Sequence, residues 1–144
     1  KDWKDLSRQL IDSKAWIDFS QGCDIRIMTE EKAECIKQMK IKLIHFAWDR
    51  YEDKDFIVPK LKIFKKFTGW NRSKVAVYVL CGFDTTIEQD LERIYTIRDI
   101  GFSPYVMIYD KYKLKKRDPL KRMQRWCNSR FIFNTCERFE DYKG

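Results

Sequence analysis

The amino-acid sequence predicts an α/β fold in which a parallel sheet is flanked by helices. Apolar, β-branched runs alternate with amphipathic helical segments at intervals of roughly 30 residues, the length of one βα unit. Val75–Leu80 is a near-continuous apolar run, which is typical of a strand buried on both faces by covering helices. In such sheets ligands bind at the carboxyl ends of the strands, so the turns that follow them are the first candidates for chemistry.

Five apolar runs are expected to form the strands, because they are rich in β-branched and aromatic residues and end in polar turns. They are Ala15–Phe19, Lys42–Trp48, Lys74–Cys81, Pro104–Tyr109 and Phe131–Asn134.

Helical periodicity appears in the segments between these runs. The expected helices are Asp2–Asp12, Glu30–Met39, Phe56–Phe67, Thr85–Ile100 and Asp118–Cys127. Thr29 is a plausible N-cap, and Thr85 with Glu88 fits a capping box. Gly101 supplies the residue that ends a helix, and Pro119 takes the favoured first position of the last one.

Composition bounds the class of protein. A chain of 144 residues with 44% hydrophobic residues is expected to form one domain with a core. No apolar run approaches the roughly 20 residues of a membrane span, and Lys1–Asp5 lacks the apolar region of a signal peptide. Five scattered cysteines without a C-x-x-C pair favour reduced thiols and a cytoplasmic setting. The net charge of +8 permits an anionic partner without specifying one.

Familiar catalytic motifs are absent from the sequence. It contains neither G-x-G-x-x-G nor G-x-x-x-x-G-K-[ST], which argues against an ordinary dinucleotide or P-loop site. His45 lies within an expected strand and is interpreted as a packed residue. Cys23, Cys81 and Cys136 follow expected strands, where buried structural thiols are a more common explanation than a metal site.

The first two strand ends supply candidate binding residues. Gln21, Asp24 and Arg26 lie in a turn that holds an amide, a carboxylate and a guanidinium beside a glycine. Such a turn can bind a polar ligand, whereas the alternative is a surface ion pair between Asp24 and Arg26. Asp49 follows the aromatic residue Trp48, so its carboxylate is a candidate acceptor for ribose hydroxyls, with a helix cap or a pair with Arg50 as the alternatives.

The segment Lys111–Arg130 is strongly basic and carries Tyr112 and Trp126 among its cations. This composition suits the phosphate backbone of a nucleic acid. The alternative is a solvated loop and helix face, which is what a run of charged residues usually forms.

Taken in succession, five segments resemble the second part of a radical S-adenosylmethionine (SAM) core, as found in proteins of bacteria and their phages. The segments are W-I-D-F-S-Q-G-C-D-I-R, I-H-F-A-W-D, Y-V-L-C-G-F-D-T-T-I-E, P-Y-V-M-I-Y-D and F-I-F-N-T-C-E-R-F-E-D-Y. The resemblance covers nearly the whole chain, and it depends on the order of the segments because no single motif is decisive. It implies an open (β/α)6 partial TIM barrel, of which the first four expected strands match the third to sixth.

The resemblance also implies roles for residues at the strand ends. Asp49 and Trp48 would contact the SAM ribose, and Arg26 would pair with the SAM carboxylate. Leu80 and Gly82 fit the family's adenine-packing pattern G-x-I-x-G-x-x-E, although Tyr78 replaces its first glycine and Thr85 its glutamate. The backbone from Val106 to Tyr109 would border the adenine.

The chain departs from the family in one large respect. The family's C-x-x-x-C-x-x-C loop, which holds a 4Fe–4S cluster, and its G-G-E segment are absent. The resemblance therefore implies a portion of a larger enzyme, with SAM and the cluster as cofactors of the parent, which would cleave SAM reductively to a 5′-deoxyadenosyl radical. This portion alone is expected to be inactive, and the cluster motif is expected upstream of Lys1. The alternatives are a non-enzymatic basic module that binds nucleic acid and a small α/β enzyme complete in this chain.

Overall fold

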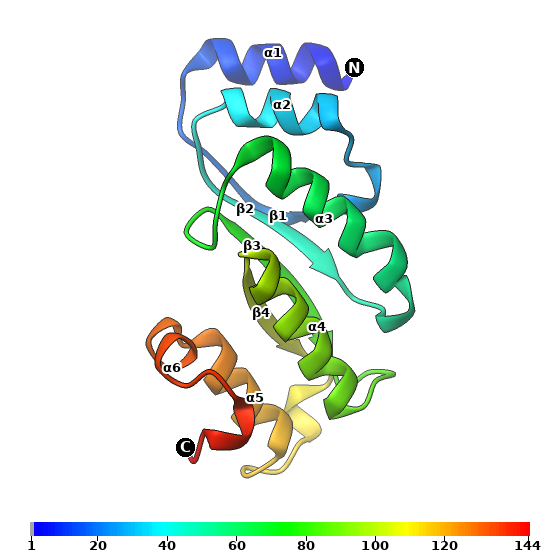
Figure 1. Cartoon of the computed structure of the whole chain (residues 1–144), viewed down its shortest axis with the longest axis vertical. Helices are drawn as coiled ribbons and strands as arrows, with labels where there is room; N and C mark the ends of the chain where they lie inside the picture. The colour runs from blue at the N-terminus through cyan, green and yellow to red at the C-terminus, as the bar shows by residue number, and fades with distance from the viewer. Residues whose placement is uncertain (1) are drawn as a thin grey trace.

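The computed structural model describes residues 2–144 and shows an α/β architecture. The strands are β1 (Ile17–Cys23), β2 (Ile41–Trp48), β3 (Val75–Cys81) and β4 (Ser103–Ile108). The helices are α1 (Trp3–Ser13), α2 (Glu30–Gln38), α3 (Lys54–Thr68), α4 (Ile87–Ile100), α5 (Pro119–Asn128) and α6 (Arg130–Thr135). The two termini lie at opposite ends of the long axis (Figure 1).

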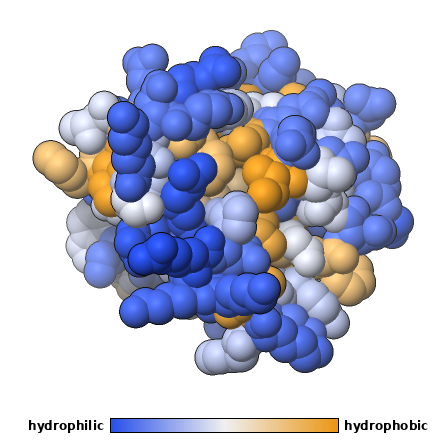
Figure 2. Space-filling view, turned by 90° about the horizontal axis from the view of Figure 1, so that it is seen from below, coloured by the Kyte–Doolittle hydropathy of each residue, from blue (hydrophilic) through white to orange (hydrophobic). Residues whose placement is uncertain are grey.

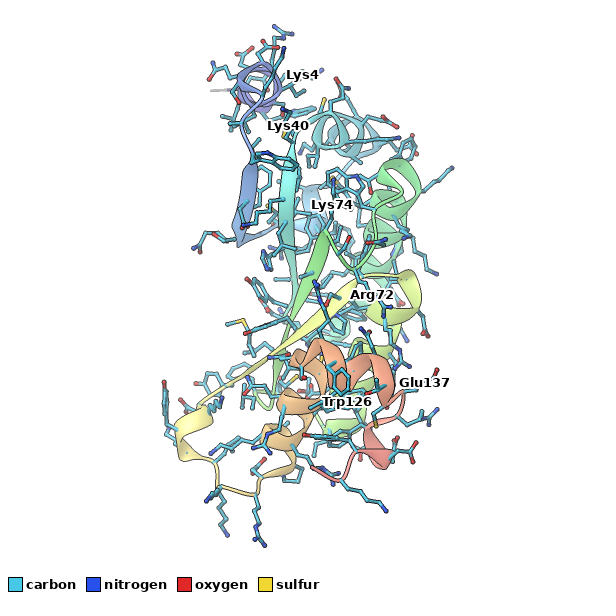
Figure 3. All side chains as sticks on the ribbon, turned by 90° about the vertical axis from the view of Figure 1, so that its left-hand side faces the viewer. Lys4, Lys40, Arg72, Lys74, Trp126 and Glu137 are labelled. Atoms are coloured by element: carbon cyan, nitrogen blue, oxygen red, sulfur yellow. The ribbon has the colours of Figure 1, made fainter. Side chains whose placement is uncertain are left out.

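The four strands form one parallel sheet in the order β1-β2-β3-β4. Because crossovers between parallel strands are almost always right-handed, a sheet wound in one direction carries its crossover helices on a single face. Helices α3 and α4 lie in front of the sheet in Figure 1, and Figure 3 shows them on one side of the strands. The sheet therefore has a helix-covered face and an open face.

The core lies between the sheet and its helices. From Ile44 onward every second residue of β2 is fully buried, namely Ile44, Phe46 and Trp48, as the alternation of side chains along a strand requires. Phe46 meets Phe64 of α3 edge to face, with 4.9 Å between the ring centroids. This covered face holds the apolar surface whose removal from water stabilises the fold.

The open face of the sheet carries aromatic side chains. His45 stacks on Tyr78 at a centroid distance of 4.8 Å, and Tyr78 meets Tyr105 edge to face at 5.7 Å. Tyr78 and Leu80 are only partly buried, so the expectation that this strand is buried on both faces is wrong. On this face, aromatic neighbours rather than a second helical layer partly cover Tyr78.

The edge of the sheet at β4 is covered by α5. Asn128 accepts a hydrogen bond from the Val106 backbone N–H at 2.7 Å and donates to the Val106 carbonyl at 3.0 Å. Gln124 donates to the same carbonyl at 3.0 Å. Pro104 has no N–H to leave unpaired. These contacts satisfy backbone groups that an exposed edge strand would offer to another chain.

The fifth expected strand, Phe131–Asn134, is wrong. These residues belong to α6, which begins after Ser129, whose side chain accepts from the Ile132 N–H. A strand would place Phe131 and Phe133 on one face, whereas Phe131 is 78% exposed and Phe133 is buried against Trp126. An apolar run this short carries too little periodicity to separate helix from strand, and the contact with Trp126 decides the outcome.

Most of the expected helix boundaries are confirmed to within two residues. Thr29 caps α2, Gly101 ends α4 in the left-handed region, and Pro119 begins α5. The capping box of α4 is formed by Thr86 and Gln89, one residue later than expected. Among residues 2–144, no helix combines the length and the apolar character needed to cross a membrane.

We predict that replacing Gly82 by alanine destabilises the protein more than replacing Gly69. Both glycines have positive φ (73° and 67°), so each alanine carries a strain of about 1–2 kcal/mol. A Cβ on Gly82 would also lie 2.5 Å from Leu120 Cδ1, whereas nothing lies within 4 Å of one on Gly69. Urea unfolding measures both variants, and equal losses of stability would show that the Leu120 contact is unimportant.

Candidate functional site

A cavity of about 260 Å³ opens at the carboxyl ends of β1 and β2. Three carboxylates line it together with Arg26 and Arg50. Asp24 and Asp49 were predicted from the sequence, and Asp53 was not. Of the expected ligand contacts, the structure thus brings Asp24, Arg26 and Asp49 together, although they come from two different strand ends. Parallel pairing of β1 with β2 produces this convergence.

Asp24 and Arg26 form a two-pronged ion pair within this cavity. Arg26 Nε donates to Asp24 Oδ1 and its Nη2 donates to Oδ2, both at 2.9 Å. Asp24 Oδ1 also accepts from the Arg26 backbone N–H at 2.9 Å, which caps the short helical turn Ile25–Ile27. The hydrogen bonds from Arg26 lower the pKa of the Asp24 carboxyl. The ion-pair alternative therefore occurs, and a ligand carboxylate would compete with Asp24 for Arg26.

The remaining charges leave the cavity negative. Arg50 pairs with Glu52, which lies outside the cavity lining. Among the described residues, neither Asp49 nor Asp53 has a cationic partner within 4 Å. Two carboxylates without a partner attract positive charge and accept hydrogen bonds from hydroxyl groups.

A fully buried ion pair connects the ends of β2 and β3. Arg93 of α4 donates from Nη2 to Asp90 Oδ1 at 2.6 Å, and both side chains have zero exposure. The same guanidinium donates to the carbonyl oxygens of Trp48 at 2.7 Å, Asp49 at 3.1 Å and Leu80 at 2.7 Å. One side chain therefore holds two neighbouring strand ends at a fixed position.

The carboxylate of Asp90 shapes the turn after β3. Its Oδ1 accepts from the Thr85 hydroxyl at 2.6 Å, and its Oδ2 accepts from the Gly82 N–H at 3.3 Å. Gly82 adopts the positive φ that this turn requires. Arg93 Nε is the buried side-chain nitrogen without a partner among the described residues.

The other predicted residues lie apart from the cavity. Trp48 is fully buried on the helix-covered face and donates from Nε1 to the Arg50 carbonyl at 2.8 Å, so its indole is closed to a ligand on the rim. Gln21 is exposed in an irregular stretch of β1 and does not line the cavity. Leu80 and Gly82 lie at the end of β3, where Arg93 and Asp90 occupy their backbone groups.

Tyr109 forms an aromatic pair at the ends of β3 and β4. It is 46% exposed and meets Phe83, which is 63% exposed, at a centroid distance of 4.6 Å. Phe83 was not among the site residues predicted from the sequence. Two exposed rings at a strand end can pack a planar group, and they lie on the same rim as Gly82.

Arg93 and Asp90 were missed by sequence reasoning, although a signal was present. Asp90 and Arg93 share the buried helical stripe of α4 with Ile94 and Ile97. Charged residues at core positions of a helix are almost never buried without a partner, so a pair at i and i+3 points to a buried ion pair.

The thiols do not gather on the rim. Because the fifth strand is absent, Cys136 follows α6 instead of a strand end. Burial raises the pKa of Cys23, raises that of Cys81 far above its usual range and raises that of Cys127 to about 12, which keeps these thiols protonated. Within residues 2–144, no group of three His, Cys, Asp or Glu side chains is placed to hold a metal.

Comparisons of this chain with protein-family models, with curated proteins and with solved structures found no match.

We predict that Arg93→Met destabilises the fold by about 3–5 kcal/mol, because it leaves the Asp90 carboxylate buried without its cation. The double variant Asp90→Leu/Arg93→Met removes both charges and should recover part of that loss. Lys4→Gln breaks the exposed pair with Glu31 and serves as the control, with little expected change. Urea unfolding measures the free energy of unfolding of all three variants. A single Arg93 variant as stable as the wild type contradicts the assigned role of the pair.

We predict that Arg26→Gln raises the pKa of Asp24, which is lowered in the wild type by hydrogen bonds from Arg26. A lowered folded-state pKa stabilises the protein above the unfolded pKa, and this contribution is lost as pH falls through the folded value. In the variant, that acid-side loss should shrink. Carboxyl-carbon NMR titration measures the Asp24 pKa, with Arg8→Gln as the exposed control. An unchanged Asp24 pKa in Arg26→Gln would mean that the ion pair does not form in solution.

Proposed function

We propose that this chain is the later portion of a radical SAM core and contributes one side of the SAM-binding site. The single observation that carries the proposal is the cavity at the ends of β1 and β2, with two carboxylates that lack a cationic partner within residues 2–144. SAM carries a sulfonium cation, an ammonium group and a ribose diol, all of which suit such carboxylates.

The architecture supports the proposal. An open (β/α)6 partial barrel needs parallel strands in sequential order with helices on the outer face, and β1-β2-β3-β4 has this arrangement. The open face of the sheet would then be the inner wall of the partial barrel. In this arrangement Asp49 would accept from the ribose, and Phe83 with Tyr109 would pack the adenine.

Two incompletely covered surfaces, on helix α1 and along the edge of strand β1, support an additional βα portion. Helix α1 packs against α2, and its Leu10 and Ile11 are partly buried against the core, yet none of its residues is fully buried and Leu6 is 50% exposed, so its apolar face is only partly covered. Strand β1 forms an edge of the sheet and pairs only with β2. A strand added beside β1 would lie under α1, as the preceding unit of a partial barrel would.

The 4Fe–4S cluster does not fit the residues of this chain. The chain has no C-x-x-x-C-x-x-C segment, and its rim thiols Cys23 and Cys81 are buried to differing degrees and held protonated. The cluster would belong to the added portion, and the chemistry it supplies to SAM belongs to the cofactor. The residues described above would bind and orient SAM. Iron and sulfide content of the full-length parent, purified without oxygen, tests this part of the proposal.

We predict that the isolated chain binds SAM more tightly than S-adenosylhomocysteine, which has the same ribose and adenine but an uncharged thioether. Asp49→Asn should weaken binding of both ligands about tenfold, because both carry the ribose diol from which Asp49 accepts, whereas the preference for SAM should persist. Isothermal titration calorimetry measures both ligands. Asp12→Asn is the matched control, because Asp12 is an exposed acid in α1 that does not line the cavity. Equal affinity for both ligands, or no binding of either, counts against the proposed site.

Nucleic-acid binding through Lys111–Arg130 is a second candidate function. It is favoured by cations of this segment that have no carboxylate partner among the described residues, including Lys111, Lys116 and Arg125. Figure 2, viewed from the end of the molecule that carries α5, shows hydrophilic side chains over much of that surface. Oligonucleotide affinity that falls steeply with salt supports this candidate.

A further inference from the structure

Three cavities meet around a single tyrosine on the open side of the sheet. Tyr105 of β4 lines all three, which measure about 340, 380 and 540 Å³. The first and third also share Asn128, and the second and third share Lys111 and Gln124. Because they share lining residues, the three cavities lie next to one another along β4 and α5, and together they are called the path here. Tyr105 is 47% exposed at the middle of it.

Cations from separate parts of the chain line this path. Its first cavity holds Arg72 and Arg130, and its third holds Lys111, Lys116, Lys121 and Arg125. Among the described residues, none of these six cations has a carboxylate within 4 Å. Two of them contact neutral groups, because Arg72 donates to Asn134 Oδ1 and Lys121 donates to the Leu114 carbonyl, both at 2.7 Å.

The one carboxylate on the path is already neutralised. Asp110 lines the second cavity and pairs with Lys113 at 2.7 Å. Beside it, Tyr112 is fully exposed and Met107 is 48% exposed. The path thus combines positive charge with accessible aromatic and apolar surface.

We propose that this path binds a single strand of nucleic acid, with a base stacked on Tyr105 and the phosphates held by the six cations. The inference rests on the second candidate function and deepens it, because it adds Tyr105 and Arg72 and fixes the form of the ligand. Arg72 comes from the loop between α3 and β3 and lies beside α6 (Figure 3), so the site is assembled only by folding.

The aromatic residue decides between single and double strands. In a duplex the bases are stacked on one another, whereas exposed tyrosines on a sheet stack unpaired bases regardless of sequence. A purely electrostatic surface for duplex DNA needs no exposed ring at its centre. Tyr105 is held in place by its edge contact with Tyr78, so little ordering is needed when a base packs on it.

The test is fluorescence anisotropy with a labelled oligo(dT) of about 12 nucleotides, within the site sizes usual for single-strand binders. Tyr105→Ala should weaken binding about tenfold, and Tyr105→Phe should retain most of the affinity because it keeps the ring. Arg72→Gln/Arg130→Gln should weaken binding and lower the slope of log affinity against log salt by about 1.4, the value for two lost phosphate contacts.

Matched control variants distinguish binding at the path from general electrostatic attraction to the protein. Trp16→Ala removes another exposed ring, and Lys37→Gln/Lys62→Gln removes two exposed cations on α2 and α3, away from the path. Both should leave affinity nearly unchanged, and circular dichroism should show all variants folded.

The outcomes distinguish this inference from the candidate function on which it rests. Wild-type binding that is insensitive to Tyr105→Ala and to the arginine variants, or that a duplex of equal length matches, overturns the single-strand path. In that case nucleic-acid binding through Lys111–Arg130 would stand. No binding of either form by the wild type overturns both, and it leaves the SAM proposal untouched because the SAM cavity is lined by other residues, at the ends of β1 and β2.

Discussion

The buried pair of Asp90 and Arg93 is the interaction on which the carboxyl end of the sheet depends. Its guanidinium holds the carbonyls of Trp48, Asp49 and Leu80, and its carboxylate holds the turn at Gly82. Desolvating two charges is costly, and removing one partner alone is more costly still. The pair therefore fixes the relative position of two strand ends, and with it the backbone of Asp49, the residue that carries the proposed SAM contact.

One-sided helix cover follows from winding the sheet in a single direction, and it leaves the other face available. That face carries the stack of His45, Tyr78 and Tyr105, in which Tyr78 also donates to the Ser20 carbonyl across the sheet at 3.1 Å. The rings cover part of this face without closing it, since Tyr105 is 47% exposed. The two proposed ligand regions lie at different parts of this arrangement, the SAM cavity at the β1 and β2 ends and the nucleic-acid path along β4.

Much of the site was predictable from residue type and position. Asp24, Arg26 and Asp49 were predicted to share a rim because parallel strands end at the same edge, and they line one cavity. The sequence pattern did not show in which direction each side chain points. Trp48 alternates onto the covered face, and Gln21 lies in an irregular stretch of β1, so neither side chain lines the cavity. The strand predicted at Phe131–Asn134 was wrong for another reason. A run of four residues fits both the helical and the strand period, and the buried contact of Phe133 with Trp126 favours the helix.

The sequence by itself determined the order and type of the main elements, because apolar periodicity, caps and glycine stops are local properties of the chain. It determined the parallel sheet through the spacing of strands and helices. Only the tertiary structure decided which pair is buried and which charges stay unpaired. Asp24 is bound to Arg26 and Arg93 is buried with Asp90, whereas Asp49 and the six cations of the nucleic-acid path have no oppositely charged neighbour within 4 Å among the described residues. The physical reason is that the burial of a pair, and the absence of charged neighbours from other elements, are set by residues far apart in the chain, even where the paired residues are close in sequence.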